Sequence, residues 1–343
     1  MKILNFIVFF FTTVHCFVEN ITEQRQQQSK DFDYVLIHVA KTGGSTAQSK
    51  VLPGLLQTTF CHRGMRVMSW GDERGLLTLM NHPNRQCHLL SFEAHLDQWQ
   101  RWTRENERPI RFLSFIRSPL SHWLSSYQHI EKLRLIAFTK SDDPAIAEYG
   151  RNFRAAHQRM LNEKWIVPHA IANTIDDNVQ QQQQQPPPPQ THIPESFDDY
   201  MNAMKQNNTG LTFILKNFQM SFFGATLKEA VQNVKSKLYW IGLTEESRLS
   251  YAMLQCQLEG RVDSARLDEL LARPINVAVE FDSRAGDAAQ PSCITNAHLK
   301  QLNEWNRDEL RFYSLVTSLF WQRVRQHQRC LIDAGELDET LLI

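Results

Sequence analysis

A lysine, two glycines and three hydroxyl residues stand together directly after a short apolar run near the amino end of the chain. They are Lys41, Thr42, Gly43, Gly44, Ser45 and Thr46, in that order. Glycines at a strand exit let backbone N–H groups turn toward an anion, and the following helix directs its N-terminus at it. In the motif G-x-x-x-x-G-K-[ST] of ATPases and GTPases the lysine follows the glycines. Here it precedes them, so the pattern predicts an anion-binding loop of another kind, or else a plain glycine turn with a surface lysine.

An arginine at the end of a later apolar run forms a second candidate anion site. Arg117 is followed eight residues later by Ser125, about two helical turns further along the chain. A guanidinium fork and a serine hydroxyl can hold one phosphate between them. The alternative is a structural salt bridge for Arg117 and a solvated helix position for Ser125.

The two segments in this order, K-T-G-G-S-T after a strand and then R-S-P-L-S-x-x-x-S, resemble the Golgi carbohydrate sulfotransferases. The heparan sulfate 6-O-sulfotransferases are the most similar, over residues 34–328. The resemblance implies that 3′-phosphoadenosine-5′-phosphosulfate is the co-substrate. Lys41 and residues 42–46 would bind its 5′-phosphosulfate end, and Arg117 and Ser125 its 3′-phosphate. It implies no metal.

Three further segments are similar to the same family. S-F-E-A-H-L-D-Q-W resembles the strand end that presents a catalytic histidine, which places that role on His95. F-D-S-R-A-G-D resembles a loop that closes over the nucleotide, with Arg284 and Gly286 at the matching positions. L-K-N-F-Q-M (215–220) resembles an Asn-x-Gln helix segment. One departure is Ser118, which stands where the 6-O enzymes have aspartate.

The reaction implied is in-line transfer of a sulfuryl group to a hydroxyl of a glycosaminoglycan-like polysaccharide, of the heparan sulfate 6-O type. Such a transfer asks mainly for positioning and charge stabilisation. His95 is the candidate general base, since a neutral imidazole accepts a proton near pH 7. Asp97 could orient its ring, and Lys41 would stabilise charge on the departing phosphate. Other histidines near enough in sequence to replace His95 are His62, His82 and His88.

The acceptor is the least defined partner. Trp99 and Trp102 could stack on a sugar ring or pack in the core. A basic cluster that could meet a polyanionic glycan comprises Arg101, Arg104, Arg108 and Arg111. The formal net charge of zero gives no reason to expect nucleic acid. Two alternatives remain, a protein-tyrosine sulfotransferase and a non-catalytic lumenal glycan-binding protein on the same scaffold. The N-terminal segment, and the loop in which the lysine precedes the glycines, argue against a cytosolic nucleotide kinase.

Short apolar runs alternate with amphipathic stretches through the body of the chain. Strands are expected within 34–39, 87–95, 110–117 and 238–246. Strand–helix alternation predicts an α/β fold, with a P-loop-like, mostly parallel sheet flanked by helices and a C-terminal helical segment. That last segment spaces apolar residues at helical intervals and is expected to pack against the core through Leu299, Leu302, Trp305, Leu310, Tyr313 and Phe320.

The segment boundaries follow from composition. Residues 1–18 are expected to be a signal peptide or a short signal-anchor, because their apolar run is shorter than the roughly 20 residues that span a bilayer. Residues 19–32 form a polar stem, and 33–329 the sulfotransferase domain. A flexible Gln/Pro-rich insertion lies at about 176–195. Residues 330–343 are a C-terminal tail.

These features predict a protein of the secretory pathway, in the Golgi lumen by the resemblance, that meets a membrane only through the N-terminal segment if it is uncleaved. The sequons at Asn20 and Asn207 agree with this compartment. Five cysteines follow the N-terminal segment, namely Cys61, Cys87, Cys256, Cys293 and Cys330. They allow two disulfides of undetermined connectivity. No cysteine or histidine spacing predicts a metal site.

Overall fold

The computed structural model describes the larger part of the chain in several stretches. These are residues 32–59, 61, 87–104, 106, 108–138, 198, 201–202, 217–272 and 295–341. The expected N-terminal segment 1–18 and the Gln/Pro insertion 176–195 lie outside them, as do both sequons and all but the last residue of the stem 19–32.

One parallel sheet of four strands, in the order β2-β1-β3-β4, organises the described residues. The strands are β1 (Asp33–Ile37), β2 (Leu89–Phe92), β3 (Ile110–Ile116) and β4 (Leu238–Leu243). β1 is buried along its whole length, as a parallel strand covered by helices on both faces must be. All four strands were expected from their apolar runs, and the prediction of an α/β fold with a parallel sheet is confirmed.

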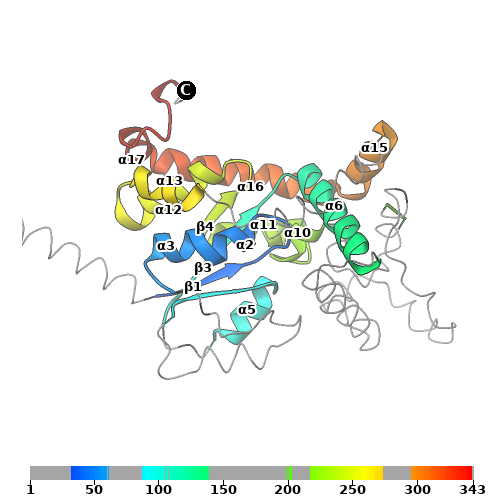
Figure 1. The fold of residues 1–343 in the computed structure, drawn as a ribbon, viewed down its shortest axis with the longest axis horizontal. Coiled ribbons are helices and arrows are strands. Elements are labelled where there is room, and N and C mark those ends of the chain that lie inside the picture. The colour runs from blue at the N-terminus through cyan, green and yellow to red at the C-terminus, as the bar shows by residue number, and fades with distance from the viewer. Residues whose placement is uncertain are drawn as a thin grey trace, which may run out of the picture.

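Helices cover the sheet and continue beyond its last strand. They are α2 (Gly44–Thr46), the π-helix η1 (Ala47–Val51), α3 (Leu52–Leu56), α5 (Leu96–Trp102), α6 (Pro119–Phe138), α10 (Phe218–Ser221), α11 (Leu227–Lys237), α12 (Ser247–Glu259), α13 (Ser264–Leu271), α15 (Asn296–Trp305), α16 (Arg307–Gln326), α17 (Gln328–Asp333) and the 3₁₀ helix η3 (Glu339–Leu341). In Figure 1 the sheet extends from the side of α5 to the side of the long helix α16, which packs on β4 and α11. The expected C-terminal helical segment is therefore present.

Local sequence signals account for several of these helix boundaries. Thr226 caps α11 by accepting a hydrogen bond from Glu229 N, and Asp263 caps α13 in the same way from Arg266 N. Such caps satisfy backbone N–H groups that have no partner within the helix. α6 begins at Pro119, where the missing N–H of proline costs nothing.

The C-terminal amphipathic stretch differs from the expectation in its buried face. It is broken at Asn306 into α15 and α16, and the break changes the phase of the helix. Of the residues expected in the core, Leu302 and Phe320 are fully buried, whereas Leu310 and Tyr313 are half-buried. The buried stripe of α16 is instead Glu309, Phe312, Val316, Phe320 and Val324.

Two disulfides settle the pairing that the sequence left open. Cys61 pairs with Cys87, next to the start of β2, and Cys256 pairs with Cys330, which joins α12 to α17. Cys330, the first residue of the expected tail 330–343, is thus joined covalently to α12. Cys293 lies outside the described residues. Disulfides persist in oxidising compartments, so the two bridges point to a lumenal or extracellular domain.

Within the described residues, no helix combines the length and apolar character needed to span a membrane. The same part of the chain holds no group of three or more His, Cys, Asp or Glu residues placed to bind a metal ion.

Candidate functional site

The carboxyl ends of the parallel strands meet at one edge of the sheet, which is where ligands bind in open α/β folds. The loop after β1 lies at this edge. Lys41 and Gly43 both have positive φ, 65° and 84°, and the buried Thr42 hydroxyl donates to Val39 O at 2.8 Å. A non-glycine residue in this region of φ is uncommon and marks a loop that its surroundings hold in place. The expected turn is present at residues 41–43 and passes directly into α2 at Gly44.

Three side chains donate hydrogen bonds to three successive carbonyl oxygens of this loop. His122 Nε2 donates to Ala40 O (3.0 Å), Arg117 Nη1 to Lys41 O (3.2 Å) and Thr244 Oγ1 to Thr42 O (2.8 Å). They come from the helix after β3, the end of β3 and the end of β4. Carbonyl oxygens occupied in this way are not presented to an anion, which leaves the loop's N–H groups and cations to meet one.

Gly44 is required by a close approach within the same loop. A Cβ added there would overlap the imidazole ring of His38, which follows β1. Burial, and then the charge of Lys41, lower the pKa of His38 to about 4, so its ring is neutral at pH 7. His38 was not among the residues predicted for the site. Its position directly after a buried strand is the signal that could have identified it.

Arg117, expected at a second anion site, lies against the loop through its bond to Lys41 O, and its backbone is held from a distant part of the chain. Gln219 Oε1 accepts from Arg117 N, and Gln219 Nε2 donates to Arg117 O, both at 2.9 Å. Burial lowers the pKa of Arg117, and the charge of Glu245 opposes this shift. Ser125 lies half-buried on the second turn of α6, the helix that begins after Arg117.

His122, on the first turn of α6, was not assigned a role in advance. Because a carbonyl oxygen only accepts, the proton of the neutral ring lies on Nε2, and Nδ1 is buried without a hydrogen-bond partner. The ring stacks on Phe218 at 5.5 Å. Burial lowers its pKa to about 4; the bond to Ala40 opposes this, and the charges of Arg117 and Lys41 add to it. His122 is therefore a neutral side chain that holds the loop through its hydrogen bond to Ala40 O.

His95 lies just beyond β2, at the same edge, and caps the start of α5. Its Nδ1 is 2.7 Å from Ser221 O, and its ring stacks on Phe222 at 4.9 Å. Since the carbonyl accepts, Nδ1 carries the proton and Nε2 of the neutral ring has the lone pair. Burial lowers the pKa of His95, while the Ser221 carbonyl and the charge of Asp97 raise it by less. The ring is thus a neutral base with a defined tautomer.

The orienting role suggested for Asp97 is wrong. α5 begins at Leu96, so Asp97 is on a helix and not on a continued strand. Its carboxylate is exposed and lies 3.7 Å from Arg101. The Ser221 carbonyl holds the imidazole instead.

Glu93 is a second group at this edge that was not predicted from the sequence. It follows β2 directly, two residues before His95, and its Oε2 is buried with no hydrogen-bond partner. Burial raises the pKa of Glu93 to about 8, and the charge of Lys41 partly opposes this shift. A buried carboxyl without partners is costly when ionised, so Glu93 is protonated at neutral pH. The signal in the sequence is a glutamate at the exit of an apolar strand.

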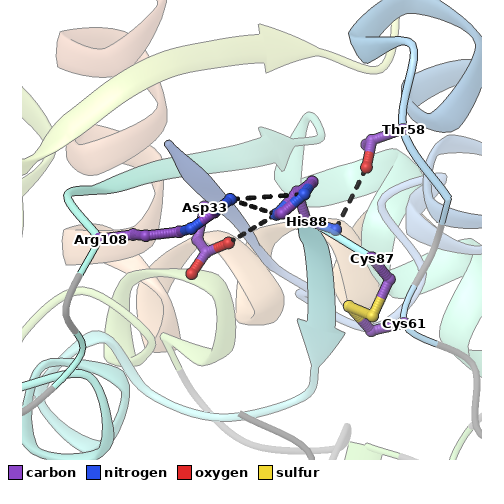
Figure 2. The surroundings of a disulfide bond; sticks show 6 residues. All are labelled: Asp33, Thr58, Cys61, Cys87, His88 and Arg108. Atoms are coloured by element: carbon purple, nitrogen blue, oxygen red, sulfur yellow. Dashed lines mark hydrogen bonds and ion pairs between the residues drawn. A yellow bond between two sulfur atoms is a disulfide. The ribbon is translucent and has the colours of Figure 1, made fainter. Parts of the chain in front are cut away.

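Several other candidates lie elsewhere. His88 is at the amino end of the strands, between Asp33 (Nδ1–Oδ1, 3.1 Å) and Arg108 (Nη1–Nδ1, 2.9 Å), as Figure 2 shows beside the Cys61–Cys87 bridge. It therefore cannot replace His95, which lies at the opposite edge. His62, His82, Arg284 and Gly286 lie outside the described residues.

The two tryptophans are explained by packing, and two arginines of the basic cluster have partners within the domain. Trp99 is fully buried, and Trp102 packs edge-on against it at 5.3 Å. Arg101 pairs with Asp97 on α5, and Arg111 lies over the rings of Phe32 and Tyr239 at the amino end of β3.

No family model matches the sequence, and no curated protein matches it. The inference of function therefore rests on the residues at the carboxyl edge of the sheet.

Proposed function

We propose that this protein is a sulfotransferase, which transfers a sulfuryl group from 3′-phosphoadenosine-5′-phosphosulfate to a hydroxyl of a glycosaminoglycan-like polysaccharide in the secretory pathway. The observation that carries the proposal is the pairing of two features at one sheet edge. A loop with Lys41, fixed by Arg117, has its carbonyl oxygens occupied, and a neutral His95 two residues beyond Glu93 has its lone pair on Nε2.

The residues present suit a highly anionic co-substrate. Lys41 and Arg117 supply positive charge, and residues 43–46 supply backbone donors, since the Thr42 N–H is bonded to Val39 O. A carboxylate near an anion site would repel the ligand, but Glu93 is protonated at neutral pH because burial raises its pKa to about 8. The apparent conflict between an acidic residue and an anion site is thereby removed.

In the proposed reaction the acceptor hydroxyl attacks sulfur as its proton passes to His95 Nε2. The bond from sulfur to the 5′-phosphate oxygen breaks, and Lys41 stabilises the charge that remains on that phosphate. The Ser221 carbonyl stabilises the imidazolium formed, since it accepts a hydrogen bond from Nδ1–H in both charge states. These steps need no group beyond the chain, the donor and the acceptor.

Transfer of radiolabelled sulfate from the donor tests the proposal directly. The secreted protein would be offered desulfated heparan sulfate, chondroitin and a tyrosine-containing acidic peptide in parallel. We expect label on heparan sulfate, lowered by about 10²- to 10⁴-fold in His95→Ala, because general bases contribute that much. Label on the peptide would move the acceptor to protein tyrosine.

Two further variants distinguish an effect on the site from a general effect on folding. Lys41→Ala should lose both transfer and binding of 3′-phosphoadenosine-5′-phosphate, the donor product. His327→Ala, at the junction of α16 and α17, should keep both. If the wild-type protein does not bind that nucleotide in calorimetry, it is not a sulfotransferase.

A further inference from the structure

One short segment contacts both halves of the candidate site. α10 and the residue after it carry Gln219, which holds Arg117 N and O, and Ser221, whose carbonyl accepts from His95 Nδ1. Phe222 stacks on the His95 ring, and its carbonyl accepts from Leu96 N at 2.8 Å. The position of α10 therefore sets the positions of Arg117 and His95 together.

α10 is in turn held by a buried carboxylate on the C-terminal helix α16. Glu309 is 1 % exposed; its Oε1 accepts from Gln219 N and its Oε2 from Met220 N, both at 3.1 Å. Asn217, just before α10, exchanges further bonds with this helix region: its N donates to Asn306 Oδ1 (2.9 Å) and its Oδ1 accepts from Glu309 N (3.0 Å). The first N–H groups of a helix lack internal partners, so a carboxylate there satisfies and orients them.

We propose that Glu309 is a positioning residue: by binding the first turn of α10, it fixes Arg117 and His95 in their relative places for sulfuryl transfer. The expected effect of Glu309 on turnover rests on the proposed function. The expected effect of Glu309 on α10 does not. The chemistry requires a carboxylate, because two donors must be accepted at once. Glutamine offers one acceptor and would direct an NH₂ group at the other N–H.

The test is Glu309→Gln, measured at pH 8, above the pKa of about 7 to which burial raises this carboxyl. Hydrogen exchange at the amides of Met220 and Leu96 should speed up by about tenfold or more. Met220 N loses its acceptor, and Leu96 N keeps Phe222 O as an acceptor whose position α10 no longer fixes. Turnover and affinity for 3′-phosphoadenosine-5′-phosphate should both fall by about tenfold, since both Arg117 and His95 are released.

The matched control is Arg323→Gln on the same helix. Arg323 donates to Leu238 O and Tyr239 O at the start of β4, away from α10. It should lower the melting temperature without changing exchange at Leu96 or turnover. A general loosening of α16 would instead give both variants the same effect, and would overturn the proposal.

Gln219→Met provides a second variant in case Glu309→Gln does not fold. It removes the clamp on Arg117 and leaves the backbone bonds from Gln219 N and Met220 N to Glu309, so nucleotide affinity should fall while exchange at Leu96 stays as in the wild type. Faster exchange at Leu96 in Gln219→Met, or unchanged exchange there in a folded Glu309→Gln, would overturn the proposal. A wild-type protein without transferase activity would refute the proposed function, and the exchange measurements would still decide this inference.

Discussion

His95 Nδ1 lies 2.7 Å from the carbonyl oxygen of Ser221, a residue 126 positions further along the chain. The carbonyl can only accept, so the contact fixes the proton on Nδ1 and the lone pair on Nε2. A hydrogen bond to the second ring nitrogen is the usual way in which proteins choose the tautomer of a functional histidine. A distant backbone atom thus determines which atom of His95 can act as a base.

The pH dependence of turnover follows from this environment. Burial lowers the pKa of His95 from its ordinary value of 6.5, although the Ser221 carbonyl and Asp97 act in the opposite direction. Only the neutral ring accepts a proton, so the acid limb of kcat/KM that belongs to His95 should have its midpoint below pH 6.5. Protonation of Glu309, whose pKa is about 7, adds a separate limb at higher pH. Asp97→Asn removes a charge that raises the pKa of His95 and should move only the lower limb further down. A midpoint at or above 6.5 for the limb that Asp97→Asn moves would contradict the assignment.

Nucleotide affinity should depend on the ionisation of Glu93. Its carboxyl is protonated below a pKa of about 8 and becomes an anion beside Lys41 above it. Binding of 3′-phosphoadenosine-5′-phosphate should therefore weaken by about tenfold between pH 7 and pH 9 in the wild-type protein. Glu93→Gln stays neutral and should show no such loss. Calorimetry at the two pH values measures this, with Glu304→Gln on α15 as a control for the change in net charge. Equal pH dependence in all three proteins would remove Glu93 from the site.

Gly44→Ala should damage the loop without unfolding the domain. The added Cβ overlaps the His38 ring, so either the ring or residues 41–46 must move. We expect nucleotide affinity to fall by about tenfold, because backbone donors are displaced from a fixed arrangement. Gly44→Ala with His38→Ala removes the overlap and should regain part of the affinity.

The control for that pair is Gly260→Ala. Gly260 has φ of +67° with nothing within 4 Å of an added Cβ, so the change costs stability, about 1 kcal/mol, and no binding. Equal affinity in Gly44→Ala and the wild-type protein would show that the loop does not hold the nucleotide.

The sheet could be predicted from the sequence because β1 and β3 are mostly apolar, apart from Asp33, Arg111 and Ser114, and such strands are typical of a parallel sheet covered on both faces. The loop at residues 41–46 could be predicted from local order after a strand, whereas the role proposed for His95 came from the resemblance of its segment to a known family. The groups that orient Arg117 and His95 could not be predicted. Gln219 reaches Arg117 across 102 positions, and Glu309 reaches Gln219 across 90. Nothing in the spacing of such residues indicates that they meet.

The phase error in the C-terminal stretch has a related cause. Apolar periodicity alone favoured Leu310 and Tyr313 for the core, but the buried stripe of α16 includes the polar Glu309. A carboxylate that bonds to α10 fixes the rotation of the helix, so the stripe is set by a polar contact that a hydrophobicity pattern does not contain.

The two disulfides should differ in their contribution to stability. Cys256–Cys330 closes a separation of 74 residues and Cys61–Cys87 one of 26. If both act by restricting the unfolded chain, removing them should lower the free energy of unfolding by about 4.5 and 3.5 kcal/mol respectively. Denaturation of the double variants Cys256→Ala/Cys330→Ala and Cys61→Ala/Cys87→Ala measures the difference. Because Cys330 is on α17, a chain ended at residue 329 should lose as much stability as the first variant, or more. A chain so shortened that kept the wild-type stability would show that the residues from 330 onward do not stabilise the domain.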